Sequence, residues 1–239
     1  MTLVSAEAGL AASRCKAPQE LLRFKAPLRH LAAEMKTAQD IKIVALGSSS
    51  TAGTGASGRA ACYPSRLEAE LNKRYPHKHF TMINLGVGGQ LASTMLARIR
   101  TEVLPQKPAL VIWQTGVNDA IADVGLDGFR ETLRRGVDEL TSQGIDVILL
   151  DMQYYPRSEY VAGYRNYLTA MRDVGREKDV PVLHRFDIMK YWVASSQFSA
   201  DELLAPDHFH ANDLTYGCLA DILADAMQDG LTRTAGPGG

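Results

Sequence analysis

The chain has 239 residues, of which 46% are apolar and 22% are charged, and its formal net charge at pH 7 is −1. These proportions are those of an ordinary soluble globular protein, and the near-zero charge offers no broad basic surface for nucleic acid or for an anionic membrane. No apolar run approaches the roughly 20 residues that a membrane-spanning helix needs. We therefore expect a globular chain with no nucleic-acid partner and no membrane span.

The first segment of the chain differs from the rest in having no strand pattern. Residues 19–39 carry leucines at near-helical spacing, but Pro27 interrupts the run, which predicts two short helices. We expect residues 1–40 to form a lead-in and a helical segment packed on the core. Residues 41–230 are expected to form the main domain, and residues 231–239 a disordered tail.

From residue 41 onwards, apolar runs alternate with amphipathic segments. Strands are predicted at residues 41–46, 79–86, 109–116, 145–152 and 180–186. Helices are predicted at residues 63–76, 91–104, 129–143, 160–178 and 212–227, with one more short helix before residue 196. This alternation, without a long linker, predicts a single-domain three-layer α/β/α sandwich with a five-stranded parallel sheet.

A run of serines follows the first predicted strand. The apolar run ends at Gly47, and Ser48, Ser49 and Ser50 come directly after it. A single serine in such a turn most simply hydrogen-bonds the turn. A serine hydroxyl at a strand end is also a candidate nucleophile, provided that the chain supplies a base, an acid that orients the base, and donors for an oxyanion.

Candidates for each of these partners occur elsewhere in the chain. Asp207 and His210 lie three residues apart, directly before the last predicted helix, so that the carboxylate can orient the imidazole. Gly89 and Asn118 follow the second and third predicted strands. Because ligands of open parallel sheets bind at the carboxyl ends of the strands, Ser49, Gly89 and Asn118 are expected at the same edge.

The blocks GSSS, NLGVGG, GVND and DHFH, in this order, resemble the four blocks of the SGNH hydrolases, also called GDSL-type esterases and lipases. The resemblance covers residues 41–227 and implies a flavodoxin-like fold. It also implies a role for each matching residue: nucleophile Ser49, base His210, acid Asp207, and oxyanion donors Ser49 (backbone N–H), Gly89 and Asn118.

The chain departs from the family pattern at two positions. Ser48 stands where the family usually has the Asp of Gly-Asp-Ser, and Gly88 stands where serine is more usual. The triad chemistry does not need that Asp, but support of the serine turn then has to come from elsewhere. Two other carboxylates at strand ends, Asp119 and Asp187, are alternatives to Asp207 as the acid.

Two motifs offer different chemistry. Asp207, His208 and His210 could contribute metal ligands, but a third firm ligand and a separate base are missing from the sequence. Residues 53–58 spell G-x-G-x-x-G, yet they begin seven residues after the strand ends and lack the expected acidic residue. We therefore expect neither a metal nor a cofactor, and we interpret these glycines as a wall of the site.

The three cysteines have no metal-type spacing. The simplest interpretation is that they are free thiols, with Cys218 packed on a helix, and the alternative is a disulfide that involves Cys15. Residues 6–8 resemble the small-residue end of a signal peptide, although no charged and apolar regions precede them. Because relatives in the resembled family are often exported, we expect a periplasmic or secreted protein, with the cytoplasm as the alternative.

These patterns predict a metal-independent serine esterase that hydrolyses short O-acyl esters, such as acetyl esters, of a carbohydrate or another small molecule. The short acyl group is inferred because no lid-like apolar segment is present. Activity should fall on acidification, because only a neutral histidine can take the serine proton. Tyr154, Tyr155 and Tyr160 follow the fourth strand and are expected near the site. The alternative is a non-catalytic α/β module that binds a phosphate or a nucleotide.

Overall fold

The computed structural model describes residues 15–234, so most of the expected lead-in and residues 235–239 of the expected tail lie outside the described residues. Five parallel strands form one sheet in the order β2-β1-β3-β4-β5. The strands are β1 (Asp40–Gly47), β2 (His79–Gly86), β3 (Leu110–Gln114), β4 (Asp146–Leu150) and β5 (Val182–Leu183). This strand order is that of flavodoxin-like folds.

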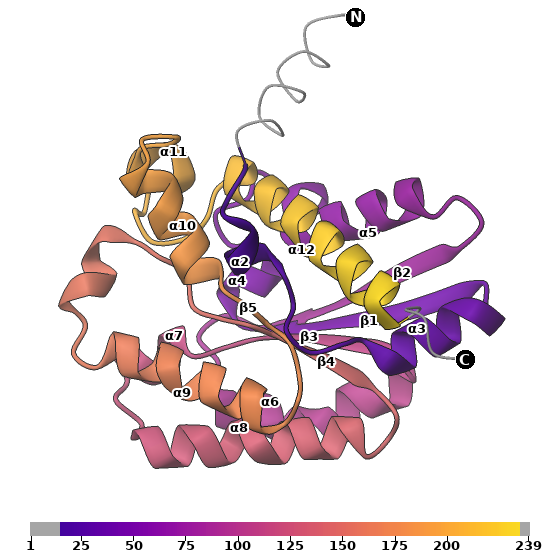
Figure 1. The fold of residues 1–239 in the computed structure, drawn as a ribbon. Helices are drawn as coiled ribbons and strands as arrows, with labels where there is room; N and C mark the ends of the chain where they lie inside the picture. Colours follow the sequence, from indigo (N-terminus) through magenta and orange to yellow (C-terminus); the bar gives the residue numbers. More distant parts are fainter. Residues whose placement is uncertain (1–14, 235–239) are drawn as a thin grey trace, which may run out of the picture.

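Helices cover both faces of the sheet, as Figure 1 shows. One face carries α3 (Arg29–Thr37), α5 (Tyr63–Arg74) and α12 (Asp213–Thr234), with α2 (Gln19–Leu22) packed on α12. The other face carries α6 (Ala92–Arg98), α8 (Leu126–Thr141) and α9 (Tyr164–Glu177). The prediction of a single-domain α/β/α sandwich with five parallel strands is therefore confirmed.

Short helical segments make up most of the connections. They are α4 (Ser49–Ala52), α7 (Val117–Ile121), α10 (Arg185–Ala194) and α11 (Ala200–Leu203), the 3-10 turns η1 (Arg59–Ala61), η3 (Leu104–Gln106) and η4 (Pro156–Tyr160), and the π-helical turn η2 (Ile99–Val103). Both α4 and α7 begin just after a strand ends, and these are the connections that carry polar side chains at the carboxyl edge of the sheet.

The central strands form the core because they are apolar on both faces. All five residues of β3 and all five of β4 are buried, as expected for parallel strands covered by helices on both sides. The register sets Leu46 beside Trp113, and Gly47 beside Gly86 at the end of β2. The strands therefore end at nearly the same level, and the residues that follow them meet at one edge.

The fifth strand is shorter than predicted, because α10 already begins at Arg185. Two contacts from the residue after β4 hold the chain in this helical turn: the Asp151 carboxylate accepts the Phe186 N–H at 2.9 Å, and the Asp151 carbonyl accepts the Arg185 Nε–H at 2.9 Å. The predicted strand over residues 180–186 is therefore correct only at its centre.

Other boundaries also shift. The helix predicted at residues 91–104 ends as an α-helix at Arg98 and continues through η2 and η3. The helix predicted at residues 160–178 starts only at Tyr164, because η4 precedes it. The expected tail from residue 231 is wrong at its start: α12 runs to Thr234, and Leu231 packs against the core.

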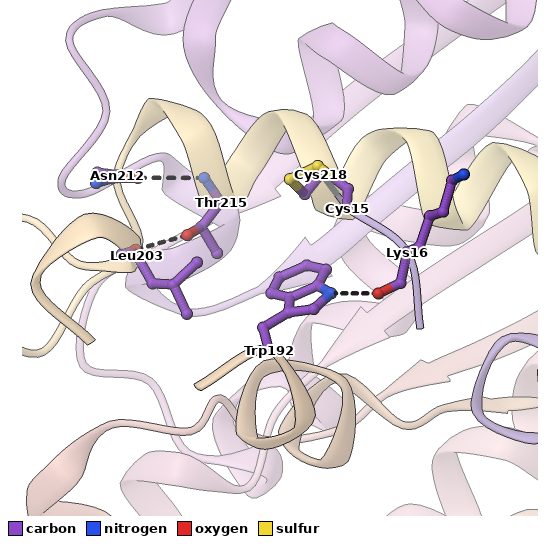
Figure 2. The surroundings of a disulfide bond; sticks show 7 residues. All are labelled: Cys15, Lys16, Trp192, Leu203, Asn212, Thr215 and Cys218. Atoms are coloured by element: carbon purple, nitrogen blue, oxygen red, sulfur yellow. Dashed lines mark hydrogen bonds between the residues drawn. A yellow bond between two sulfur atoms is a disulfide. The ribbon is translucent and has the colours of Figure 1, made fainter. Parts of the chain in front are cut away.

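The free-thiol interpretation of the cysteines is wrong for two of them. Cys15 and Cys218 form a disulfide that joins the start of the described chain to α12, and only Cys62 among the described cysteines is free (Figure 2). The Trp192 indole N–H donates to the Lys16 carbonyl at 3.1 Å beside this bond. We call residues 15–28 the N-terminal strap.

The N-terminal strap packs on the core next to α12. Phe24 and Leu28 are buried, and both belong to the same apolar cluster as α12. The helices α2 and α3 lie on either side of Pro27, as predicted. Among the helices of the described residues, none combines the length and the apolar character needed to cross a membrane.

Candidate active site

Ser49 is the first residue of α4, directly after β1. The turn is possible because residue 47 is a glycine: a side chain there would overlap the Thr51 hydroxyl and the Gln114 carboxamide, which pack over the strand end. Of the three serines, Ser48 and Ser50 are buried, whereas Ser49 is partly exposed. The hydroxyl that sequence analysis selected is therefore the one that a substrate can reach.

Ser49, His210 and Asp207 form one hydrogen-bonded chain. The His210 Nε2 atom lies 2.9 Å from the Ser49 Oγ atom, and the His210 Nδ1 atom lies 2.6 Å from an Asp207 carboxylate oxygen. With the proton on Nδ1 held by the carboxylate, Nε2 is free to accept the serine proton. The structure thus brings together three residues that span 161 positions of the chain.

The Asp207 carboxylate is held ionised by its surroundings. Partial burial opposes ionisation, but hydrogen bonds from the His210 ring and from the backbone N–H groups of His210 and Phe209 outweigh it and lower the pKa of Asp207 to about 2. The two backbone bonds are 2.9 and 3.0 Å long. An acid that accepts from its own loop in this way is both charged and fixed in orientation.

The loop that carries Asp207 and His210 closes on itself and on the glycine-rich segment. The Ala205 N–H donates to the His210 carbonyl at 2.8 Å. Gly55 has a φ of 89°, and a side chain there would press on the Ala211 carbonyl and on the His210 Cβ. Glycine at this position therefore allows the close approach of the glycine-rich segment to the loop that carries His210.

The metal-ligand alternative finds no support in the placement of His208. Its imidazole is largely exposed and lies 3.3 Å from Asp201, while the Asp207 carboxylate is engaged by His210. Within residues 15–234, no three side chains of histidine, cysteine, aspartate or glutamate gather as a metal site would require.

Gly89 and Asn118 lie in neighbouring connections at the carboxyl edge of the sheet. Gly89 lies in the turn after β2, and Asn118 lies in α7 after β3. The Asn118 amide donates to the Gln90 carbonyl at 2.8 Å, and the Asp119 carboxylate accepts the Ala92 N–H at 3.0 and 3.2 Å. Two consecutive side chains of α7 thereby fix the turn that presents the Gly89 N–H.

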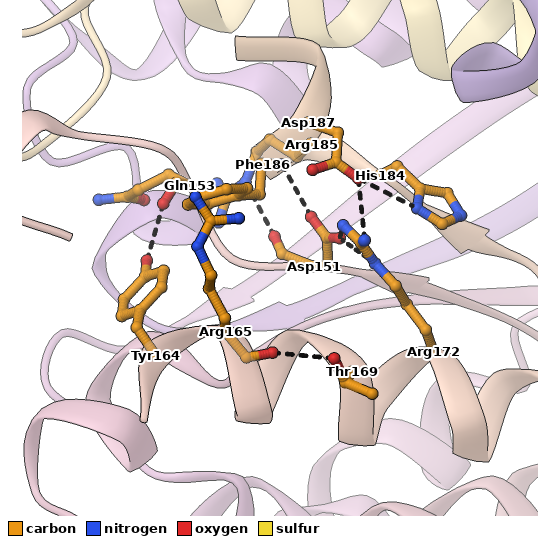
Figure 3. Close-up of polar contacts among 10 residues, drawn as sticks. All are labelled: Asp151, Gln153, Tyr164, Arg165, Thr169, Arg172, His184, Arg185, Phe186 and Asp187. Carbon is orange, nitrogen blue, oxygen red and sulfur yellow. Dashed lines mark hydrogen bonds and ion pairs between the residues drawn. The ribbon is translucent and has the colours of Figure 1, made fainter. Parts of the chain in front are cut away.

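Neither alternative acid contacts His210. Asp119 is buried, accepts from Ala92 and from the Thr115 hydroxyl, and has its pKa raised by burial. Asp187 pairs with Arg172 at 2.8 Å and lies 3.8 Å from the His184 ring, as Figure 3 shows. Both carboxylates hold the fold together.

Sequence analysis missed the support of the serine turn, which comes from Gln114. The Gln114 carboxamide oxygen accepts from the Ser48 N–H at 3.1 Å, from the Ser48 hydroxyl at 3.2 Å and from the Thr51 hydroxyl at 3.0 Å. Gln114 therefore supports the serine turn, although Ser48 replaces the Asp that the resembled family usually has there. A buried glutamine at the end of an otherwise apolar strand was the signal available in the sequence.

The tyrosines after β4 have separate environments. Tyr155 is buried and packs edge-on against Phe209, with ring centroids 4.8 Å apart, and Phe209 in turn packs against the His210 ring at 4.7 Å. Tyr154 packs against Phe186. Tyr160 is 88% exposed at the end of η4. Phe209 therefore contacts the His210 ring directly, and Tyr155 packs behind Phe209.

The sequence of the chain is similar to known proteins. A profile of the non-GDSL lipase-like family matches residues 14–233. An uncharacterised lipoprotein of Bacillus subtilis (strain 168), YqeF, is 28% identical over 191 residues, which are 68% of this chain and 76% of the relative.

Solved structures with a similar fold include two esterases. A two-domain esterase active on acetylated mannans has a TM-score of 0.74 and 22% identity over 88% of this chain, and the chain spans 56% of its length. An acetyl xylan esterase from Geobacillus stearothermophilus has a TM-score of 0.65 and 22% identity, with 80% of this chain and 94% of that one covered. The chain therefore has the fold of these two solved esterases, and it belongs to the non-GDSL lipase-like family.

Proposed function

We propose that this chain is a serine esterase that removes a short O-acyl group, such as acetyl, from a carbohydrate or another small ester. The observation that carries the proposal is the continuous chain from the Ser49 Oγ through the His210 imidazole to the Asp207 carboxylate, with heavy-atom distances of 2.9 and 2.6 Å. These distances lie within the range that proton transfer between a nucleophile and its base needs.

The reaction follows from the geometry. His210 Nε2 takes the Ser49 proton as Oγ attacks the ester carbonyl carbon, and the carbonyl oxygen becomes an oxyanion. The backbone N–H groups of Ser49 and Gly89 and the second amide proton of Asn118 are the proposed donors to it. The tetrahedral intermediate then collapses and expels the alcohol, which takes the proton from His210. Water, deprotonated by the same histidine, then hydrolyses the acyl-enzyme and regenerates Ser49.

The proposed substrate class has two supports. Two proteins of similar fold are described as acting on acetylated mannans and as an acetyl xylan esterase. The sequence also contains no lid-like apolar segment that would cover a long acyl chain. A series of p-nitrophenyl esters from acetate to palmitate tests this point. Activity should be highest on the shortest esters, and activity that rises steadily toward long chains would sink the proposal.

An extracytoplasmic location is part of the proposal. Disulfides are rare in the cytosol, where reductants keep thiols reduced, so the Cys15–Cys218 bond favours an oxidising compartment. The relative from Bacillus subtilis is a lipoprotein. Acid quenching of the source cells, followed by alkylation of the denatured but unreduced protein and mass spectrometry, tests this. One alkylated cysteine per molecule, Cys62, is expected, and three would indicate a reducing compartment.

Hydrolysis of p-nitrophenyl acetate, with a chelator present, tests the mechanism. Ser49→Ala should lower kcat/KM by about 10³-fold or more, because the nucleophile is lost. Ser142→Ala, on the exposed end of α8, is the matched control and should stay within about twofold of the wild type. Equal activity of wild type and Ser49→Ala would refute the assignment, and activity lost to the chelator would point to a metal mechanism.

A further inference from the structure

Gln153 is a buried glutamine whose carboxamide contacts both halves of the site. It lies three residues after β4 and is 1% exposed. Its Oε1 atom accepts the Ser50 hydroxyl at 2.7 Å, and its Nε2 atom donates to the Phe209 carbonyl at 2.9 Å. The orientation of the amide is fixed by chemistry, because a carbonyl oxygen can only accept and must face the nitrogen.

The backbone around Gln153 is anchored on the side away from the site. The Tyr164 hydroxyl donates to the Gln153 carbonyl at 2.7 Å (Figure 3). Two residues earlier, the buried Asp151 carboxylate accepts from Arg172 of α9 at 2.7 Å and from the Phe186 N–H of α10 at 2.9 Å. The carboxamide therefore projects from a segment that two helices hold in place.

The two partners of Gln153 are the immediate neighbours of the nucleophile and of the base: Ser50 follows Ser49, and Phe209 precedes His210. One side chain thus spans the gap between α4 and the loop that carries the base. We propose that Gln153 is a positioning residue that sets the distance between the Ser49 Oγ and the His210 Nε2. The expected effect of Gln153 on the rate rests on the proposed function, whereas its effect on the distance between Ser49 and His210 does not.

A tether matters here because residues 206–208, which include the acid, are the exposed part of this loop. The Asp207 side chain is 47% exposed, and its hydrogen bonds go to the same loop, so they orient His210 without fixing the loop against α4. Loss of the tether lets Asp207 and His210 move together. The Asp207–His210 bond should then survive while the His210–Ser49 bond lengthens.

Gln153→Met tests the tether, because methionine is similar in length and makes neither hydrogen bond. We expect kcat to fall about 10- to 100-fold with little change in KM, as for a small misplacement of reacting groups. Asn72→Leu is the matched control: Asn72 also bridges two segments through its amide, by two bonds to Phe80 at the start of β2. It should keep kcat within about twofold at a similar fall in Tm.

Ser50→Ala removes the same bridge from the other end. If the bridge acts as a unit, the double variant with Gln153→Met should be no slower than Gln153→Met alone. The positioning role would be overturned if the kcat losses of the two single variants multiplied in the double variant. It would also be overturned by an unchanged kcat in Gln153→Met, or by an equal loss of kcat in Asn72→Leu.

The ¹⁵N resonances of the two His210 ring nitrogens give a readout that is independent of activity. In Gln153→Met, the Nε2 shift should move toward its value in Ser49→Ala, while the Nδ1 shift stays, because Asp207 travels with the ring. Both shifts should be unchanged in Asn72→Leu. If these shifts are observed but the wild-type protein hydrolyses no ester, the tether role of Gln153 is supported and the proposed esterase function is refuted. Unchanged shifts in an active Gln153→Met would refute the tether and leave the esterase standing.

Discussion

The nucleophile and its base are held in different ways. Ser49 begins a helix wedged against the sheet, and its neighbours Ser48, Ser50 and Thr51 are buried and hydrogen-bonded to glutamines of the core. His210, whose side chain is 15% exposed, lies on a loop in which residues 206–208 are exposed to solvent. The nucleophile half is therefore part of the fold, and the base half is attached to it by a few specific contacts.

This difference indicates which changes cost stability and which cost only rate. Substitutions around Ser49 disturb buried polar groups that the sheet depends on, so both stability and activity should fall. Substitutions on the Asp207–His210 loop remove chemistry from an exposed segment, so activity should fall with little unfolding. The predictions below test this contrast, from the largest expected effect to the smallest.

Asp207→Asn should give the largest loss, about 10⁴-fold in kcat, because an amide does not hold the proton of His210 on Nδ1 or stabilise the imidazolium. The asparagine oxygen can still accept from the backbone of Phe209 and His210, so Tm should change little. Steady-state kinetics and thermal unfolding of the same preparation measure both. Asp201→Asn, beside His208, is the control, and a loss below tenfold in Asp207→Asn would show that another acid serves His210.

Asn118→Ala should lower kcat by about 10²- to 10³-fold, the usual cost of one oxyanion donor. The change also removes the bond to the Gln90 carbonyl, which holds the turn with Gly89. KM for the acetate ester should change little, because the donor acts on charge that develops in the transition state. An unchanged kcat with a raised KM would mean that Asn118 contacts substrate only in the ground state.

Gln114→Met tests the nucleophile half. It leaves the Ser48 N–H and two hydroxyls without their buried acceptor, so the free energy of unfolding should fall by about 1–3 kcal/mol. Activity should fall about tenfold, because Ser49 loses its support. Denaturant unfolding and kcat measure the two effects. Full stability with impaired activity would contradict the contrast between the two halves.

Cys15→Ser should affect stability without affecting rate. The disulfide closes a loop across 203 positions, and its loss should lower the free energy of unfolding by about 2–4 kcal/mol. The strap carries none of the proposed catalytic groups, so kcat should stay within about twofold. Cys62→Ser separates a general effect of thiol removal from loss of the bond, and an unchanged unfolding free energy in Cys15→Ser would contradict this role of the disulfide.

Ionisation of Asp207 should make a small contribution to the change of stability with pH under acidic conditions. Its folded-state pKa of about 2 lies below the ordinary aspartate value near 3.9, so its contribution is present above that value and is lost as pH falls toward 2. The wild type should lose more stability than Asp207→Asn between pH 5 and pH 2. Parallel stability curves for the two proteins would contradict the lowered pKa.

Much of the fold followed from local patterns. The strand at residues 79–86 and the break at Pro27 were predicted because alternation and proline act within a few residues. The positions of Ser49 and His210 followed from the order of four blocks, since a strand end and a loop before a helix are both visible in sequence.

What sequence analysis missed depends on long-range contacts. Gln114 and Gln153 contact residues 66 and 103 positions away, and a glutamine leaves no periodic trace. The disulfide between Cys15 and Cys218 joins residues 203 positions apart. The fifth strand was predicted too long because the Asp151 contacts, which turn the chain into α10, come from another strand end.

The most direct test of the central claim is covalent labelling of the nucleophile. Incubation with diethyl p-nitrophenyl phosphate, followed by peptide mass spectrometry, should show one diethylphosphoryl group per molecule on Ser49. The adduct should be absent in Ser49→Ala and should form far more slowly in Asp207→Asn, since the base is impaired. A protein that hydrolyses p-nitrophenyl acetate but carries the adduct on another residue, or carries none, would contradict the claim that Ser49 and His210 are the reacting pair.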